Sequence, residues 1–384
     1  MSPSTSLLVV VIAILAALAA RTVPHRPLLI VPFYPKPPPA LDGPYALNTV
    51  LTDLCVDVTL AHPFDLAGAE TAIASPDGLS WYTATSAGVV ARIDVDGDVD
   101  AGTALLTAHP LAYLGGRPLG LALHPELGVV VADAARGLFS VSEETGIVTL
   151  LAASVDPEGT DPILYADDVD VDADSGTIYF SDASTIAPWR NADNSFETFE
   201  ASVKDALEAG HTGRLLAYHP ANRSVEVLAD GLYFANGVAL SEDKTFVVVA
   251  ETFAARVSRV WLTSDRRGDV EVLIDNLPGY PDGVSAFKET FWISIAAPRS
   301  KFLELVHPYA PVKSVFSLLP RWMVPKPRKH GMAIQIDPTG AVVRTLHDPS
   351  GEVVPMVTGI HAMAVDRLLI GNLKGDGIIL CRGV

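Results

Sequence analysis

Four side chains with oxygen donors lie near the start of similar sequence units that are far apart along the chain: Glu70, Asp167, Asn236 and Asp282. Carboxylates that converge in a buried place repel one another, and a bound cation is the simplest way to neutralise them. Oxygen donors without His or Cys favour Ca²⁺ over zinc or copper. The alternative is that each acid only completes its own turn, as Asp282 followed by Gly283 would do unaided.

A repeating β-architecture would bring these residues together. From Asp65 onward, short apolar strands alternate with Gly-, Asp-, Asn- and Pro-containing turns, and a pair of strands around one turn recurs as a unit. The six copies start at Glu70, Pro118, Asp167, Asn236, Asp282 and His361. Their spacing predicts an all-β fold, a six-bladed β-propeller in which the first strand of each blade lines the axis.

Two of the intervals between units are longer than the others and predict insertions at about 186–211 and 297–329. The first contains the best helical candidate, 196–209, and the second is rich in proline. We expect these short helical insertions to lie over one mouth of the central channel.

Composition excludes some classes of function. The chain has 384 residues with 27 Lys and Arg against 45 Asp and Glu, a formal charge of −18. Such a chain repels phosphate backbones, so no nucleic-acid partner is expected. With 49% hydrophobic residues it can bury a large core, which excludes disorder for most of its length.

The N-terminus carries an apolar run at 7–20 without a charged residue. The run is short for a membrane-spanning helix and has the length of a signal-peptide core, although no Lys or Arg precedes it. We therefore predict a hydrophobic helix at 1–23 that is a signal peptide or membrane anchor, a Pro-rich linker at 24–48 and a propeller at 49–384. This organisation indicates the secretory pathway, with a secreted or single-pass membrane protein that contacts the membrane through the N-terminal segment if it is uncleaved.

Five other residues are candidates for special roles. Cys55 and Cys381 lie at opposite ends of the folded region, and spacing alone leaves open a disulfide or two buried thiols. Asn222 begins a glycosylation sequon in a polar turn. His361 and His330 are possible channel-facing proton shuttles, although a lone His at a strand start is more often structural.

Several segments carry a family resemblance, among them YADDVDVDADSGTIYFSDAS from Tyr165 and DGLYFANGVALSEDKTFVVVAET from Asp230. They resemble the strictosidine synthase-like family, which is similar in fold to paraoxonases and gluconolactonases. The resemblance implies an axial calcium held at the positions of Glu70, Asn236 and Asp282. Asp167 stands where the family usually has Asn, which adds a charge. As in paraoxonases, it also implies ring closure by a disulfide, which suits Cys55 and Cys381.

Differences from these relatives reduce the number of reactions that are expected of this chain. The last blade has Met363 where strictosidine synthase has its catalytic Glu, which argues against amine and aldehyde condensation. Leu119 and Asp133 replace the paraoxonase His pair. What remains is a gluconolactonase-type arrangement, in which Asp282 is the catalytic base or nucleophile beside calcium.

The expected function is therefore a calcium-dependent hydrolase of small-molecule esters or lactones. Two alternatives stay open. One is a membrane-tethered or secreted non-catalytic propeller that binds a partner or an apolar ligand, and the other is a strictosidine synthase-type condensing enzyme. Fold alone does not choose between them.

Overall fold

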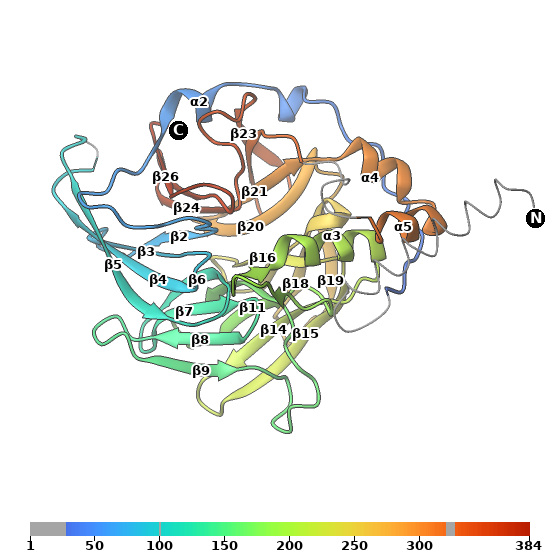
Figure 1. Ribbon diagram of the computed structural model, residues 1–384, viewed down its shortest axis with the longest axis horizontal. Helices are drawn as coiled ribbons and strands as arrows, with labels where there is room; N and C mark the ends of the chain where they lie inside the picture. Colours follow the sequence, from blue (N-terminus) through green and yellow to red (C-terminus); the bar gives the residue numbers. More distant parts are fainter. Residues whose placement is uncertain (1–27, 100, 320–326) are drawn as a thin grey trace, which may run out of the picture.

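The computed structural model describes residues 28–384 except 100 and 320–326, and in these residues the strands form six four-stranded antiparallel sheets (Figure 1). The first strand of each sheet contacts the first strand of the next, and the sixth contacts the first, so the sheets close into a ring. The predicted six-bladed β-propeller is confirmed. The predicted apolar helix at 1–23 lies outside the described residues.

Each of the first three blades begins at one of the repeated sequence units. Blade 1 contains β2 (Ala72–Ala74), β3 (Ser80–Ala84), β4 (Val89–Asp96) and β5 (Leu105–Tyr113). Blade 2 contains β6 (Pro118–His124), β7 (Gly128–Asp133), β8 (Gly137–Val141) and β9 (Val148–Ala152). Blade 3 contains β10 (Ala166–Val171), β11 (Ile178–Asp182), β14 (Gly213–His219) and β15 (Ser224–Leu232).

The other three blades follow the same order, except that the last one borrows a strand. Blade 4 contains β16 (Ala235–Leu240), β17 (Phe246–Glu251), β18 (Arg256–Trp261) and β19 (Val270–Ile274). Blade 5 contains β20 (Gly279–Phe287), β21 (Thr290–Pro298), β22 (Gly331–Ile336) and β23 (Val342–Asp348). Blade 6 contains β24 (Gly359–Ala364), β25 (Arg367–Gly371), β26 (Ile379–Arg382) and β1 (Cys55–Asp57).

The ring is closed by strands from both ends of the folded chain. In blade 6, β1 pairs with β26 in a register that places Cys55 opposite Cys381. These two residues form a disulfide, so the pairing implied by the family resemblance is confirmed. A cross-link over so many residues restricts the unfolded chain, which stabilises the closed ring.

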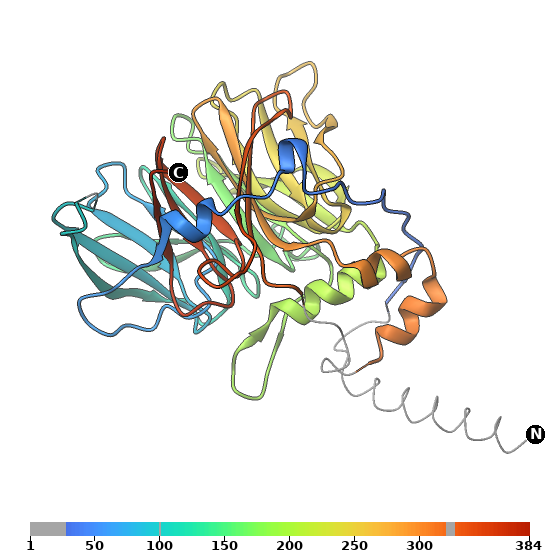
Figure 2. The ribbon, with the colours of Figure 1, turned by 90° about the horizontal axis from the view of Figure 1, so that it is seen from above.

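The helices lie outside the blades. They are α2 (Val50–Leu54), α3 (Thr198–Glu208), α4 (Lys301–Val306) and α5 (Ala310–Phe316), with short 3-10 turns η1 (Gly43–Tyr45) and η2 (Thr252–Ala254) and a small hairpin of β12 (Trp189–Arg190) and β13 (Phe196–Glu197). Helix α3 occupies the predicted helical stretch; the Glu197 side chain caps its start, and Ala209 ends it in a left-handed conformation. Figure 2 shows α3, α4 and α5 together on one side of the propeller. None of the described helices is long and apolar enough to cross a bilayer.

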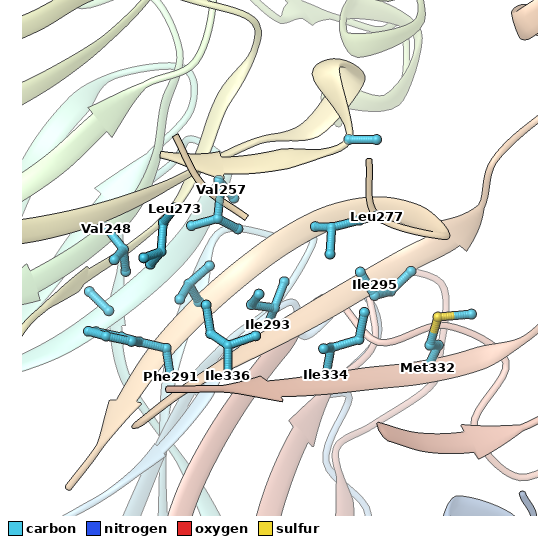
Figure 3. Packing of buried hydrophobic residues seen from close by; sticks show 14 of the residues in the cluster. Val248, Val257, Leu273, Leu277, Phe291, Ile293, Ile295, Met332, Ile334 and Ile336 are labelled. Carbon is cyan, nitrogen blue, oxygen red and sulfur yellow. The ribbon is translucent and has the colours of Figure 1, made fainter. Parts of the chain in front are cut away.

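The hydrophobic core lies between adjacent blades. Between blades 4 and 5, for example, Val248 and Val257 pack in one cluster with Ile293 and Ile334, and all four side chains are fully buried (Figure 3). β-Branched residues suit this place because they fill the pleated faces of strands. These interfaces hold the first strands at fixed positions around the axis.

Candidate functional site

The four predicted ligands stand at matching places in four blades. Glu70 comes two residues before β2, Asp167 is the second residue of β10, Asn236 is the second residue of β16, and Asp282 lies near the start of β20. All four side chains are buried, at 7%, 3%, 4% and 7% exposure in that order. The structure therefore places them at the same level of the axial ring of strands, as the shared register predicts.

Direct and electrostatic interactions connect these side chains. The Asn236 side-chain amide donates a hydrogen bond to Oδ1 of Asp282 at 2.5 Å. The charge of Glu70 acts on both Asp167 and Asp282. We call this group of four side chains the acidic ring.

Glycines allow the strands to approach closely at the ring. A Cβ on Gly237 would lie 2.2 Å from the backbone nitrogen of Val284 and 2.4 Å from the carbonyl oxygen of Asp282. A Cβ on Gly283 would lie 2.6 Å from the carbonyl oxygen of Thr358. Each glycine directly follows a ring position, so the absence of a side chain there brings the ring residues of neighbouring blades together.

Burial makes the acidic ring hard to ionise. It raises the pKa of Glu70 to about 7, against an opposing effect of the Arg117 guanidinium. It also raises the pKa values of Asp167 and Asp282 well above the usual range, and the nearby charge of Glu70 raises both further. Three negative charges in this place need protons or a cation to balance them.

The donor chemistry of the ring fits Ca²⁺. Every side chain in it offers oxygen, and Oε2 of Glu70 is a buried oxygen with no hydrogen-bond partner among the described residues. Turning the Asn236 amide would direct its oxygen, instead of its nitrogen, toward the other ligands. In the described part of the chain, however, no three His, Cys, Asp or Glu side chains converge tightly enough to form a recognisable metal centre.

Arg117 is a ring neighbour that sequence reasoning missed. Its side chain is 3% exposed, and its guanidinium donates to the carbonyl oxygens of Pro118 and Gly68 at 2.9 and 2.8 Å. The positive charge interacts first with Glu70 and also with Asp133 and Asp167. The signal was present in the sequence, where Arg117 directly precedes Pro118, the start of the second repeat unit. A buried Arg beside the ring partly balances its negative charge.

Two further carboxylates link blade 3 to blade 4, and of these Asp168 is buried and Asp170 is partly buried. Asp168 accepts a hydrogen bond from the backbone nitrogen of Val238 at 2.9 Å, and Asp170 accepts one from Leu240 at 2.8 Å. Burial raises the pKa of Asp168 to about 7 and that of Asp170 to about 6. Their oxygens satisfy backbone groups of the next blade, so we interpret them as structural.

The two sides of the ring differ. On the side of the insertions lies an apolar cluster that includes Leu119, Tyr165, Phe234 and Ala201 of α3. Tyr165 of this cluster is near the ring, since the charges of Asp167 and Glu70 act on it. Further along the first strands, a cavity of about 590 Å³ opens on the axis, and His361 lies in its wall.

The remaining candidates lie away from the ring. His330 is buried in blade 5 against His347, with 3.0 Å between Nε2 and Nδ1, and it is not among the residues that line the cavity. Asn222 is exposed in the turn between β14 and β15, where its side chain accepts a hydrogen bond from the Ser224 hydroxyl. Modification of Asn222 stays a prediction.

Comparison with solved structures defines the class of fold. A gluconolactonase from Xanthomonas campestris superposes with a TM-score of 0.58 at 16% identity, covering 94% of this chain and 99% of that one. A calcium-binding protein, regucalcin, from Agrobacterium tumefaciens gives 0.53 at 17% identity, covering 84% and 91%. At such identities the likeness establishes the fold alone, a six-bladed β-propeller.

Sequence comparison defines the family. A family model for strictosidine synthase matches residues 167–265. Adipocyte plasma membrane-associated protein of Mus musculus is 30% identical over 369 residues, which cover 93% of this chain and 85% of the relative. Protein Strictosidine Synthase-Like 13 of Arabidopsis thaliana is 36% identical over 256 residues, or 65% of this chain and 60% of the plant protein. This chain therefore belongs to the strictosidine synthase-like family.

Proposed function

We propose that this protein is a calcium-dependent hydrolase of small-molecule esters or lactones, with Asp282 as its catalytic group. The observation that carries the proposal is the acidic ring, four buried side chains with oxygen donors near the start of the first strand in four blades. The names of the structural neighbours, a gluconolactonase and a calcium-binding protein, agree with it.

In this proposal Glu70, Asp167, Asn236 and Asp282 would hold Ca²⁺. When bound, the ion would supply Lewis-acid polarisation of the scissile carbonyl and stabilise negative charge on its oxygen. Asn236 would offer its side-chain oxygen after the amide turns, in place of the hydrogen bond that its nitrogen donates to Asp282 at 2.5 Å. Arg117 would limit the repulsion between carboxylates by its charge beside Glu70.

Asp282 would act as the general base. Its carboxylate takes a proton from water, the water oxygen bonds to the carbonyl carbon, and the carbon–oxygen bond to the leaving group breaks. The leaving oxygen then receives the proton from Asp282, so the products are a carboxylic acid and an alcohol, or a hydroxy acid from a lactone. The apolar cluster beside the ring would keep other water from competing for the base.

The test is a hydrolysis screen. The purified full chain is assayed on phenyl acetate and on γ- and δ-lactones, with EDTA and then with excess CaCl₂ after removal of the chelator. We expect turnover that EDTA abolishes and Ca²⁺ restores. Calcium binding by calorimetry without turnover on any ester or lactone would instead support a non-catalytic propeller that binds a partner or an apolar ligand.

We further propose that the protein enters the secretory pathway, as a secreted or single-pass membrane protein. The apolar run at 7–20, the disulfide and the names of the membrane-associated relatives support this placement. Fractionation of cells that express the full chain, followed by mass mapping of the N-terminus and of Asn222, tests cleavage and glycosylation separately.

A further inference from the structure

One side of the molecule exposes large apolar residues that the fold leaves uncovered. They belong to the N-terminal segment and to α4, α5 and their connection, and we call them the cap patch: Leu29, Val31, Leu305, Tyr309, Val312 and Val315. Leu29 and Leu305 are 71% and 70% exposed. Exposed apolar residues that gather in one place mark an interaction surface, whereas scattered ones do not.

Contacts between these segments hold the cap patch together. The backbone nitrogen of Phe33 donates to the carbonyl oxygen of His307, which follows α4, at 2.9 Å. The buried ammonium of Lys313 in α5 donates to the carbonyl oxygen of Val31 at 2.5 Å. On α5, Val312 and Val315 are three residues apart and share a helix face. Figure 2 shows the two orange helices beside the blue N-terminal segment.

The charge around the cap patch is opposite to that of the whole chain. Among the described residues from Arg299 to Lys329, the Arg299 side chain is buried and paired with Glu304, the one acid, and Lys313 is fully buried. The exposed charges that remain in this stretch are the cations at 301, 328 and 329. The whole chain carries −18. Exposed cations in the segment that carries an apolar surface suit a membrane with anionic headgroups, which attract Lys and Arg while the apolar side chains enter the interface.

The sequence that precedes the cap patch also points to a membrane. The described chain begins at Leu28, next to Leu29 of the patch, and the uncharged apolar run at 7–20 comes only seven residues earlier. Seven residues span at most about 25 Å. If the run enters a bilayer, the cap patch stays within that distance of the lipid surface, at a high effective concentration.

We propose that the cap patch docks on the surface of an anionic bilayer, so that the propeller lies against the membrane through α4, α5 and the N-terminal segment. This inference concerns orientation and does not depend on the proposed hydrolysis. The other possible occupants of the patch, the apolar run of the same chain or a second copy, are outcomes of the test.

The test places a fluorophore on the patch of the full chain. The two native cysteines form a disulfide, so Val315→Cys offers a single thiol for an environment-sensitive dye. Val270→Cys on the outer strand β19, also exposed, is the matched control. Both proteins are reconstituted in vesicles of phosphatidylcholine and phosphatidylserine that contain a spin-labelled lipid quencher.

We expect the lipid quencher to act on the dye at 315 and not on the dye at 270. Adding Leu305→Asp and Val312→Asp to the 315-labelled protein should lower the ratio of docked to undocked molecules about tenfold, because two apolar anchors are lost and two negative charges face anionic lipid. Val270→Asp with Val272→Asp, the matched pair on β19, should leave the quenching at 315 unchanged. Vesicles without phosphatidylserine should give weaker quenching.

Three results would overturn the proposal. Equal lipid quenching at 315 and 270 would mean that the propeller is not oriented. Shielding of the dye at 315 from iodide in detergent would show that the protein's own apolar run covers the patch. Shielding that grows with protein density would indicate a second copy. Hydrogen exchange of the unlabelled full chain in nanodiscs, compared with detergent, provides a check without substitutions: protection should rise at residues 301–318.

Discussion

The propeller axis and the interfaces between blades are both buried, but their chemistry is opposite. At the interface of blades 4 and 5, Ile293, Ile334 and Val248 are fully buried apolar side chains in a continuous cluster. On the axis, Glu70 and Asp282 are buried almost as completely, yet they are carboxylates. The interfaces between blades therefore provide the stability that allows the axis to hold buried carboxylates.

The free energies of burial in these two regions have opposite signs. Full burial of an aliphatic side chain stabilises the folded state by about 1.5–3 kcal/mol, whereas burial of unbalanced carboxylates destabilises it. The acidic ring is therefore not held by its own interactions. It is held by the strand backbones, which approach closely at Gly237 and Gly283.

The largest effect is expected for Asp282→Asn. The amide keeps an oxygen donor but cannot accept a proton, and loss of a general base lowers kcat by about 100- to 10,000-fold. Steady-state kinetics on the best substrate of the ester and lactone screen measures this. Asp170→Asn, at a partly buried carboxylate outside the ring, is the control and should retain activity. Full turnover by Asp282→Asn would exclude Asp282 as the base.

Removal of the ring closure should have the next largest effect. Replacement of both Cys55 and Cys381 by Ser removes the covalent link between β1 and β26. The unfolded chain is then less restricted, and the free energy of unfolding should fall by up to about 5 kcal/mol. Denaturant titration of the double variant measures the loss. A change below about 1 kcal/mol would show that the strand pairing of blade 6 closes the ring without the cross-link.

An interface substitution should cost somewhat less. Ile293 is 0% exposed, and Ile293→Ala leaves a cavity between blades, so the free energy of unfolding should fall by about 2–5 kcal/mol. Val343→Ala, at a side chain that is 54% exposed, should change it by less than about 0.5 kcal/mol. Equal effects of the two substitutions would contradict the assignment of stability to the interfaces.

The sequence predicted the fold well because the signal was local and repeated. Each unit pairs two apolar strands around one turn, so the blade count and the common register of Glu70 and Asp282 followed from periodicity alone. The helix near residues 198–208 also carried its own pattern. The disulfide needed the family resemblance in addition, since spacing left the free thiols possible.

What the sequence could not predict depends on contacts between blades. Arg117 reaches Glu70 of the preceding blade, and Asp168 bonds to the backbone of the next one. Nothing in the spacing of Asp167 and Asp168 tells which of the two faces the ring and which bonds to a neighbouring strand. The contact between His330 and His347 is likewise tertiary, and it does not follow from the position of either residue in its own strand.

A smaller effect is expected for Asp167→Asn. In the presence of chelator, this change removes one of the three carboxylates of the ring, so thermal or denaturant unfolding should show a gain of about 1–3 kcal/mol. Calcium affinity, measured by calorimetry, should fall because a charged ligand becomes neutral. A loss of stability in chelator would mean that the Asp167 charge is balanced within the protein, with Arg117 as the nearest source.

The smallest effect is expected for the stability of the protein at acidic pH. Burial and the neighbouring His330 lower the pKa of His347 to about 4 from its ordinary 6.5, so between these pH values the unfolded chain binds more protons at this residue than the folded chain does. Titration of His347 therefore does not reduce the free energy of unfolding above pH 6.5. As the pH drops from 6.5 toward 4, it lowers the free energy of unfolding by up to about 1.4 kcal/mol per pH unit.

The acidic ring has the opposite response, because raised carboxyl pKa values such as that of Glu70 favour the folded state as the pH falls. The His contribution must therefore be isolated by subtraction. His347→Gln removes the titration, and its stability relative to the wild type should rise as the pH falls from 6.5 to 4 in chelator-containing buffer. Parallel curves for the wild type and His347→Gln would mean that His347 binds its proton in the folded state as readily as in the unfolded chain.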